Sequence, residues 1–259
     1  MSPTPDPATP VLEPPAVPEP PSGGHLPADT LHLLDAREQR PRLSRAGREP
    51  GPVWLAPPQL PPGPLVWLAL EGGPEGEPVD RAIHHWGLAV DDGRGEPRPE
   101  AITADFEDHR GRHAWERFVA RASEIIERFP DARWVHYSPR EKALVRAHAA
   151  ACGTPAGFLE RLEEACFELL SRGVRRAVRL PLDSCSIRQV ATYAGYRWRS
   201  PPPGPAGSVD PYQKARASAD PVERAHILRE IADSNAEHLL AMRAVWRWMI
   251  EQGPKEYCG

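Results

Sequence analysis

Apolar and polar positions follow two different periods along this chain, and the period changes near residue 112. An unbroken apolar run, 65–70, ends on Glu71 and a Gly-Gly-Pro turn. Such a run, bounded by Gly and Pro, is typical of a short strand buried on both faces. Further strands are expected at 83–90 and 101–106. The short, turn-rich links between the three strands favour an antiparallel meander.

From Arg112 onward the apolar spacing becomes helical. Apolar residues recur every three or four positions up to Phe129, and Pro130 ends this helix. A fourth strand is expected at 133–137. Helices are expected over four further segments: 139–151, 156–172, 186–196 and 221–251. This order of elements predicts an α/β fold in which a mixed sheet carries helices on its faces.

Composition separates the first quarter of the chain from the rest. Nine of the 33 prolines lie within residues 1–22, where no packed core can form. This arm is interpreted as a tether, and a ligand for a proline-binding module is the alternative. The expected division of the chain is a disordered arm (1–24), a connector with a short helix (25–63), a folded domain (64–251) and a tail (252–259).

Charge and cysteines limit the class of protein. A net charge of -4 argues against tight, nonspecific binding to long duplex nucleic acid, although it leaves room for a local basic groove. The four cysteines show no zinc-type spacing and are interpreted as reduced thiols of a cytoplasmic protein. No signal peptide is expected. No apolar run approaches the roughly 18–20 residues of a membrane span, so we expect no membrane partner.

Several short motifs follow the predicted elements in order. Ala69-Leu70-Glu71-Gly72 ends the first strand, and His136-Tyr137-Ser138-Pro139-Arg140-Glu141 follows the fourth. Phe167-Glu168-Leu169 and then Ser186-Ile187-Arg188 come next. Ser234-Asn235-Ala236-Glu237-His238 lies on the final helix. Residues 234 and 238 are one turn apart and share a face of that helix.

On these motifs, residues 25–251 resemble the ribonuclease H-like domain of the YprB type, which also forms the C-terminal half of a group of RecB-family nucleases. The resemblance implies a ribonuclease H-like α/β fold with a mixed sheet of the five-stranded type. It also implies membership of the 3′–5′ exonucleases that use four acidic residues and two metal ions. The chain departs from the family pattern at Ala69 and His238, where the family has carboxylates, and at Ser234, where it has tyrosine.

These replacements bear on the metal site that the resemblance implies. Two-metal hydrolysis holds two Mg²⁺ or Mn²⁺ ions roughly 3.5–4 Å apart with hard oxygen ligands, and Ala69 offers none. One interpretation is a vestigial pocket with a hydrogen-bonded Glu71 and a packed His238. The other is a rearranged one-metal catalytic site of Glu71, Glu141 and His238. In that site Glu71 and His238 are the metal ligands, and the histidine suits Mn²⁺ or Zn²⁺.

We therefore expect a pseudo-nuclease that binds single-stranded nucleic acid or a protein partner without cutting. The alternatives are an active, Mn²⁺-preferring 3′–5′ exonuclease and a structural module of a nuclease or helicase assembly. The candidate nucleic-acid contacts in the motifs are His136, Tyr137, Arg140 and Arg188. The arginine-rich stretch 172–199 also carries Tyr193, Tyr196 and Trp198, and is either a nucleic-acid face or a solvated helix surface.

Four further side chains are candidates for simpler roles. Glu168 is expected to be a partly exposed helix residue rather than a ligand. Glu237 points away from the face shared by residues 234 and 238, so we expect it to be solvated. His84 and His85 are adjacent on a strand and face opposite ways. We therefore expect them to pack rather than to bind a metal together.

Overall fold

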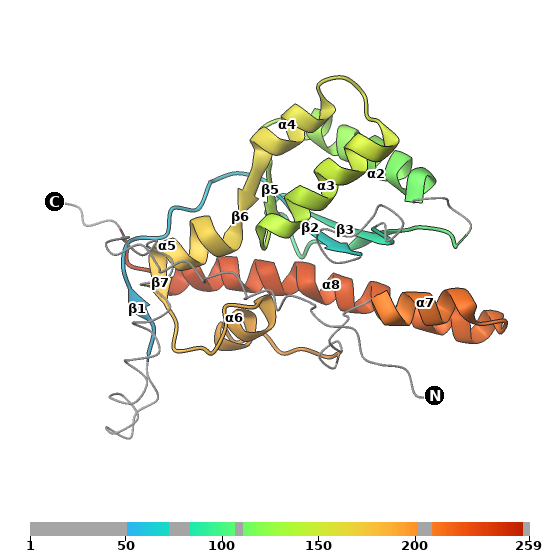
Figure 1. Ribbon diagram of the computed structural model, residues 1–259. Coiled ribbons are helices and arrows are strands. Elements are labelled where there is room, and N and C mark those ends of the chain that lie inside the picture. Colours follow the sequence, from blue (N-terminus) through green and yellow to red (C-terminus); the bar gives the residue numbers. More distant parts are fainter. Residues whose placement is uncertain (1–50, 73–82, 107–110, 201–208, 256–259) are drawn as a thin grey trace, which may run out of the picture.

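A mixed five-stranded sheet forms the centre of the computed structural model, which describes residues 51–72, 83–106, 111–200 and 209–255 (Figure 1). The strand order is β4-β3-β2-β5-β6. The strands are β2 (Leu65–Glu71), β3 (His85–Asp91), β4 (Glu100–Thr103), β5 (Arg133–His136) and β6 (Cys166–Glu168). The expected meander is confirmed, because β3 is antiparallel to both β2 and β4. Strands β5 and β6 continue the sheet in parallel on the other side of β2.

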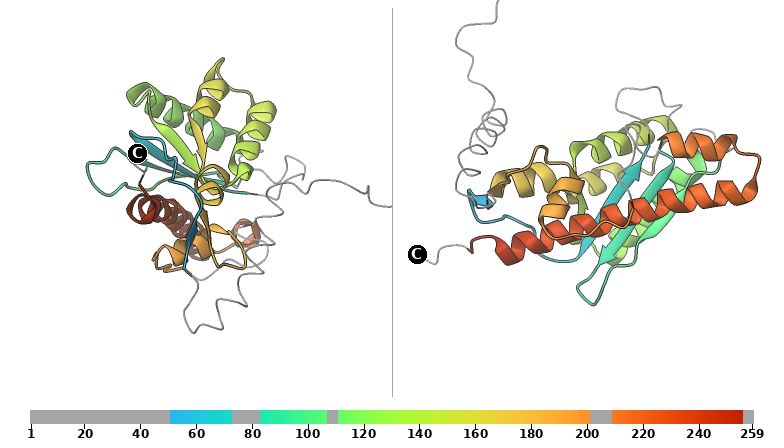
Figure 2. Two further views of the ribbon diagram at one scale, coloured as in Figure 1. Left: turned by 90° about the vertical axis from the view of Figure 1, so that its left-hand side faces the viewer. Right: turned by 90° about the horizontal axis from the view of Figure 1, so that it is seen from below.

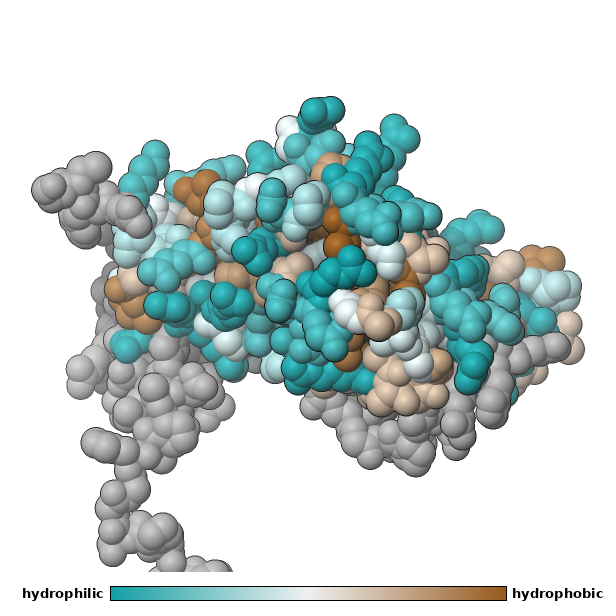
Figure 3. Space-filling view, turned by 90° about the horizontal axis from the view of Figure 1, so that it is seen from above, coloured by the Kyte–Doolittle hydropathy of each residue, from teal (hydrophilic) through white to brown (hydrophobic). Residues whose placement is uncertain are grey.

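Helices cover both faces of this sheet (Figures 1 and 2). One layer holds α2 (Arg112–Arg128), α3 (Pro139–Cys152) and α4 (Phe158–Ala165). The other holds α6 (Ile187–Tyr193) and the long α8 (Pro221–Gln252), with α7 (Val209–Ala217) packed against α8. The outer surface of the α2–α4 layer is largely hydrophilic (Figure 3), as expected for amphipathic helices. Among the described residues, no helix has the length and apolarity needed to cross a membrane.

Strand β2 is apolar from Leu65 to Leu70 because both of its faces are buried there. Val66, Leu68 and Leu70 belong to the core beneath α2, α3 and α4. Trp67 and Ala69 belong to the core beneath α8. The period of two along a strand therefore separates the two hydrophobic cores residue by residue. It also decides which layer each polar side chain meets at the end of the strand.

The prediction of one continuous helix over 156–172 is wrong. The structure has α4 there, then β6, and then a π-helical turn, Leu169–Val174, which leads into α5 (Arg175–Ala177). Residues 166–168 pair in parallel with β5, with His136 opposite Glu168. Strand pairing across the sheet has thus overridden the helical spacing of the apolar residues.

Other differences from the expected elements are smaller. β1 (Val53–Trp54) and β7 (Val178–Arg179) form a two-stranded antiparallel pair. The sequence pattern did not predict this pair, because two residues are too few to show an alternation. The third strand is shorter than expected and begins one residue earlier. The arm, the helix over 25–39 and the loop over 201–207 lie outside the described residues.

Candidate functional site

The candidate site lies at the carboxyl end of β2, where Glu71 meets His238 of α8. Glu71 is two residues beyond Ala69, so the alternation of the strand directs it toward the α8 layer. His238 Nδ1 lies 3.3 Å from Glu71 Oε1. One turn earlier on α8, Asn235 Nδ2 donates to the Ala69 carbonyl at 3.2 Å. Two polar contacts, one from Asn235 and one from His238, therefore join α8 to the end of β2.

This contact is partly shielded from water. The side chain of His238 is 22% exposed and that of Glu71 is 15% exposed. Partial burial strengthens the attraction between a carboxylate and a protonated imidazole relative to an exposed pair. Position 238 of α8 thus faces the glutamate at the end of β2. It is occupied here by a group that pairs with that glutamate.

Two buried histidines lie near Glu71, His84 just before β3 and His85 as its first residue. His85 stands opposite Glu71 in the register of β2 and β3, and its Nδ1 lies 3.0 Å from Thr103 Oγ1. The His84 ring stacks on Tyr212 with centroids 4.2 Å apart. Burial lowers the pKa of each histidine to about 4, although the charge of Glu71 raises both values. Both rings are therefore neutral at pH 7.

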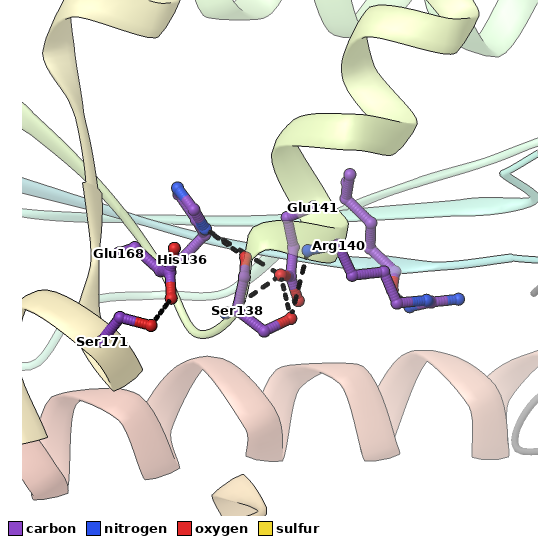
Figure 4. Close-up of polar contacts among 7 residues, drawn as sticks. His136, Ser138, Arg140, Glu141, Glu168 and Ser171 are labelled. Atoms are coloured by element: carbon purple, nitrogen blue, oxygen red, sulfur yellow. Dashed lines mark hydrogen bonds and ion pairs between the residues drawn. The ribbon is translucent and has the colours of Figure 1, made fainter. Parts of the chain in front are cut away.

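Glu141 is held at the start of α3 by a capping box. Its Oε2 accepts hydrogen bonds from the Ser138 amide at 3.2 Å and from Ser138 Oγ at 2.9 Å (Figure 4). Ser138 Oγ in turn accepts from the Arg140 amide. His136 Nδ1 lies 2.7 Å from the Ser138 carbonyl oxygen and 3.9 Å from Glu141 Oε2. The carboxylate of the second motif thus satisfies backbone groups that every helix start leaves open.

Glu168 lies at the end of β6 rather than on a helix, so its expected position is wrong, although it is partly exposed as expected. Its Oε1 accepts from Ser171 Oγ in the π-helical turn (Figure 4). Glu168 is opposite His136 in the register, and Trp134, two residues before His136, belongs to the α2–α4 core. Strand alternation therefore directs Glu168 and His136 toward the face opposite to that of Glu71.

The three candidate catalytic residues are only partly brought together. Glu71 and His238 are in contact, whereas Glu141 is bound within the cap of α3. Across the described ranges, no group of three His, Cys, Asp or Glu side chains is placed to hold a metal ion. The residues present do not fit a two-metal site, because Ala69 has no ligand atom and Glu141 binds its own helix.

The four candidate nucleic-acid contacts each bind the protein's own backbone. Tyr137 is buried, and its hydroxyl donates to the Cys185 carbonyl. Burial also raises the pKa of this phenol. Arg140 donates to the carbonyls of Leu70 and Gly72, at 3.4 and 2.9 Å.

Arg188 donates to the Ser200 carbonyl at 3.1 Å, and His136 contacts the carbonyl of Ser138. All four motif side chains therefore fix strand ends and loops. Other cations of the arginine-rich stretch are exposed, namely Arg172, Arg176, Arg197 and Arg199.

Glu237 was expected to be solvated, and this is wrong. It is only 7% exposed and accepts hydrogen bonds from the amides of Arg199 and Ser200, at 2.6 and 2.8 Å, and from Ser200 Oγ. Burial opposes ionisation, but these hydrogen bonds outweigh it and lower the pKa of the carboxyl. The helical period alone could not reveal this, because the segment that covers Glu237 has no regular structure.

No protein-family model and no curated protein matches this chain.

Proposed function

We propose that this chain is a ribonuclease H-like domain of the 3′–5′ exonuclease type that binds single-stranded nucleic acid without cleaving it. The observation that carries the proposal is the contact between Glu71 and His238 at the end of β2. An exonuclease of this type needs acidic oxygens here to bind its metal ions. The imidazole of His238, 3.3 Å from Glu71 Oε1, instead stands where such an oxygen is needed and occupies one side of the Glu71 carboxylate.

The arrangement of the sheet supports the fold in this proposal. A three-stranded antiparallel meander lies on one side of β2 and two parallel strands lie on the other. This is the sheet arrangement expected of ribonuclease H-like domains. The chain reverses its direction of travel across the sheet between β2 and β5, and ligands of open α/β sheets bind at the carboxyl ends of the strands at such a point.

Fixed positive charge beside Glu71 supports a role in binding rather than in metal catalysis. The Arg140 guanidinium is held on two carbonyls at the end of β2. A positioned arginine favours phosphate oxygens and disfavours Mg²⁺. The exposed arginines near residue 199 extend the same sign of charge along the surface.

A nuclease or helicase partner protein is the second candidate ligand, because all four motif side chains already serve the domain's own structure. A protein partner would bind the domain as a rigid module.

The described cysteines Cys152, Cys166 and Cys185 are free thiols, and this supports the reducing cytoplasm as the compartment of the proposed function.

Fluorescence anisotropy with short, labelled single-stranded DNA, RNA and duplex DNA tests the proposal. We expect the single strands to bind more tightly than the duplex and to bind equally with EDTA and with Mg²⁺. Replacing Arg197 and Arg199 by Gln should weaken binding and reduce its salt dependence, whereas Arg112→Gln, on the exposed part of α2, should not. Failure of every nucleic acid to bind would favour the protein partner.

A further inference from the structure

A five-residue segment after α6 crosses α8 next to the Glu71–His238 contact. Gly195 has a left-handed φ of 91°, which turns the chain at the end of α6, and the Tyr196 amide then donates to the Ala191 carbonyl. Residues Tyr196–Ser200 follow as neither helix nor strand. We call this segment the strap. It lies against α8, on which Glu237 and His238 are neighbours.

One carboxylate fastens the far end of the strap to α8. Glu237 accepts both consecutive amides, those of Arg199 and Ser200, together with the Ser200 hydroxyl. A buried carboxylate is costly unless such donors satisfy it. This side chain therefore acts as the latch of the strap.

The strap places an aromatic ring on the candidate site. The Trp198 ring packs edge-on against His238, with centroids 5.5 Å apart. The Tyr196 ring also packs edge-on against Trp198, with ring centroids 5.1 Å apart. The Arg188 guanidinium carbon lies over the Trp198 ring, 4.3 Å from its centroid. An indole thus has an imidazole, a phenol and a guanidinium packed around it, and the imidazole in turn contacts Glu71. These are the groups on which nucleic-acid bases stack.

We propose that the strap is an autoinhibitory cover, in which Trp198 occupies the place of a stacked base and Glu237 holds the strap closed. The proposal rests on the proposed function, since the ligand that competes with the strap is single-stranded nucleic acid. Opening the strap frees His238, Tyr196 and Trp198 to contact that strand. Segments with few regular backbone hydrogen bonds open at low free-energy cost, and water can replace the donors to Glu237.

Glu237→Ala tests the latch, with Glu251→Ala as the matched control. Glu251 is an exposed carboxylate of the same helix, and its ion pair is with Arg247 one turn away. Amide hydrogen exchange at Arg199 and Ser200 should accelerate about tenfold or more in Glu237→Ala and remain unchanged in the control. Carbethoxylation of His238 by diethylpyrocarbonate, measured by peptide mass spectrometry, should accelerate severalfold. Affinity for labelled oligothymidylate should rise by about tenfold.

Trp198→Ala provides a second variant, in which the latch is kept and the cover is removed. It should also accelerate the modification of His238 by diethylpyrocarbonate. This variant therefore still tests the cover if Glu237→Ala fails to fold. Unchanged exchange at Arg199 and Ser200 in Glu237→Ala would overturn the latch. Faster exchange with unchanged His238 modification and unchanged binding would overturn the cover.

The two proposals fail in different ways. If neither the wild-type chain nor any variant binds oligothymidylate, but His238 becomes reactive when the strap is released, the cover stands and the nucleic-acid function fails. If the wild-type chain binds oligothymidylate and release of the strap does not change that affinity, the function stands and autoinhibition is contradicted.

Discussion

The side chain of Asn235 fills the space that a side chain at Gly87 would need. A Cβ built on Gly87 would lie 1.7 Å from Asn235 Oδ1 and 3.3 Å from the Ala69 carbonyl oxygen. Gly87 and Ala69 are partners in the register of β2 and β3. Helix α8 can therefore pack directly on the backbone of both strands. This close approach fixes the position of α8 against β2 and so places His238 next to Glu71.

Replacing Gly87 by alanine should destabilise the protein by about 3 kcal/mol, because the added methyl group displaces Asn235 or moves the whole of α8. Chemical denaturation measures this loss. Gly95→Ala is the control, since a Cβ there meets nothing within 4 Å. Its free energy of unfolding should change by less than about 0.5 kcal/mol. Equal stability of the two variants would show that α8 does not approach β3 this closely.

The contact between Glu71 and His238 should appear as a coupling energy. A double-mutant cycle of Glu71→Gln and His238→Gln, measured near pH 6, should give about 1 kcal/mol of coupling, because both side chains are mostly buried. Glu71 with His226 provides a non-contacting comparison, since His226 lies on the exposed start of α8 beside Glu230. A coupling for Glu71 and His238 no larger than that comparison would mean that the two groups do not interact.

Glu141 should behave as a capping residue of α3. Glu141→Ala should reduce the free energy of unfolding by about 1 kcal/mol, because the Ser138 amide loses its acceptor. Glu141→Gln keeps a side-chain oxygen at this position and should lose much less. Thermal or denaturant unfolding of both variants distinguishes them. If the alanine variant were as stable as the wild type, the capping role would be wrong.

Stability should fall on acidification because of His84 and His85. Burial lowers the folded-state pKa of each to about 4, below the ordinary value of 6.5. Between these values the unfolded chain binds more protons, so each histidine removes up to about 3 kcal/mol of stability as the pH falls from 7 to 4.

Unfolding of wild type and His85→Gln across this pH range measures the effect. The variant should show a shallower pH dependence, because one titrating group is gone. Parallel curves for the two proteins would contradict the low pKa of His85.

The elements that the sequence predicted well are those with one dominant local signal. The apolar run 65–70 predicted β2 because a run this short, bounded by Gly and Pro, is typical of a doubly buried strand. The third motif gave no such signal, because residues 166–168 carry helical spacing and become a strand only by pairing with β5. The final helix was predicted correctly, and its end differs from the expected one by a single residue.

The partners of the site residues could not be predicted in the same way. The role of Glu237 depends on residues 199 and 200, which reach it through an irregular segment. The role of Glu141 could have been found, because Ser138, Pro139 and Glu141 are a capping box in the sequence itself. Its carboxylate looked like a ligand because the resemblance gave it that role.

The most direct test of the central claim is incubation of the purified chain with end-labelled single-stranded DNA and RNA, with Mg²⁺ or Mn²⁺, beside Glu71→Ala. The proposed function predicts that the strands are bound and remain full length under every condition. Metal-dependent shortening from the 3′ end that disappears in Glu71→Ala would contradict it, and would show that Glu71 serves a working exonuclease site.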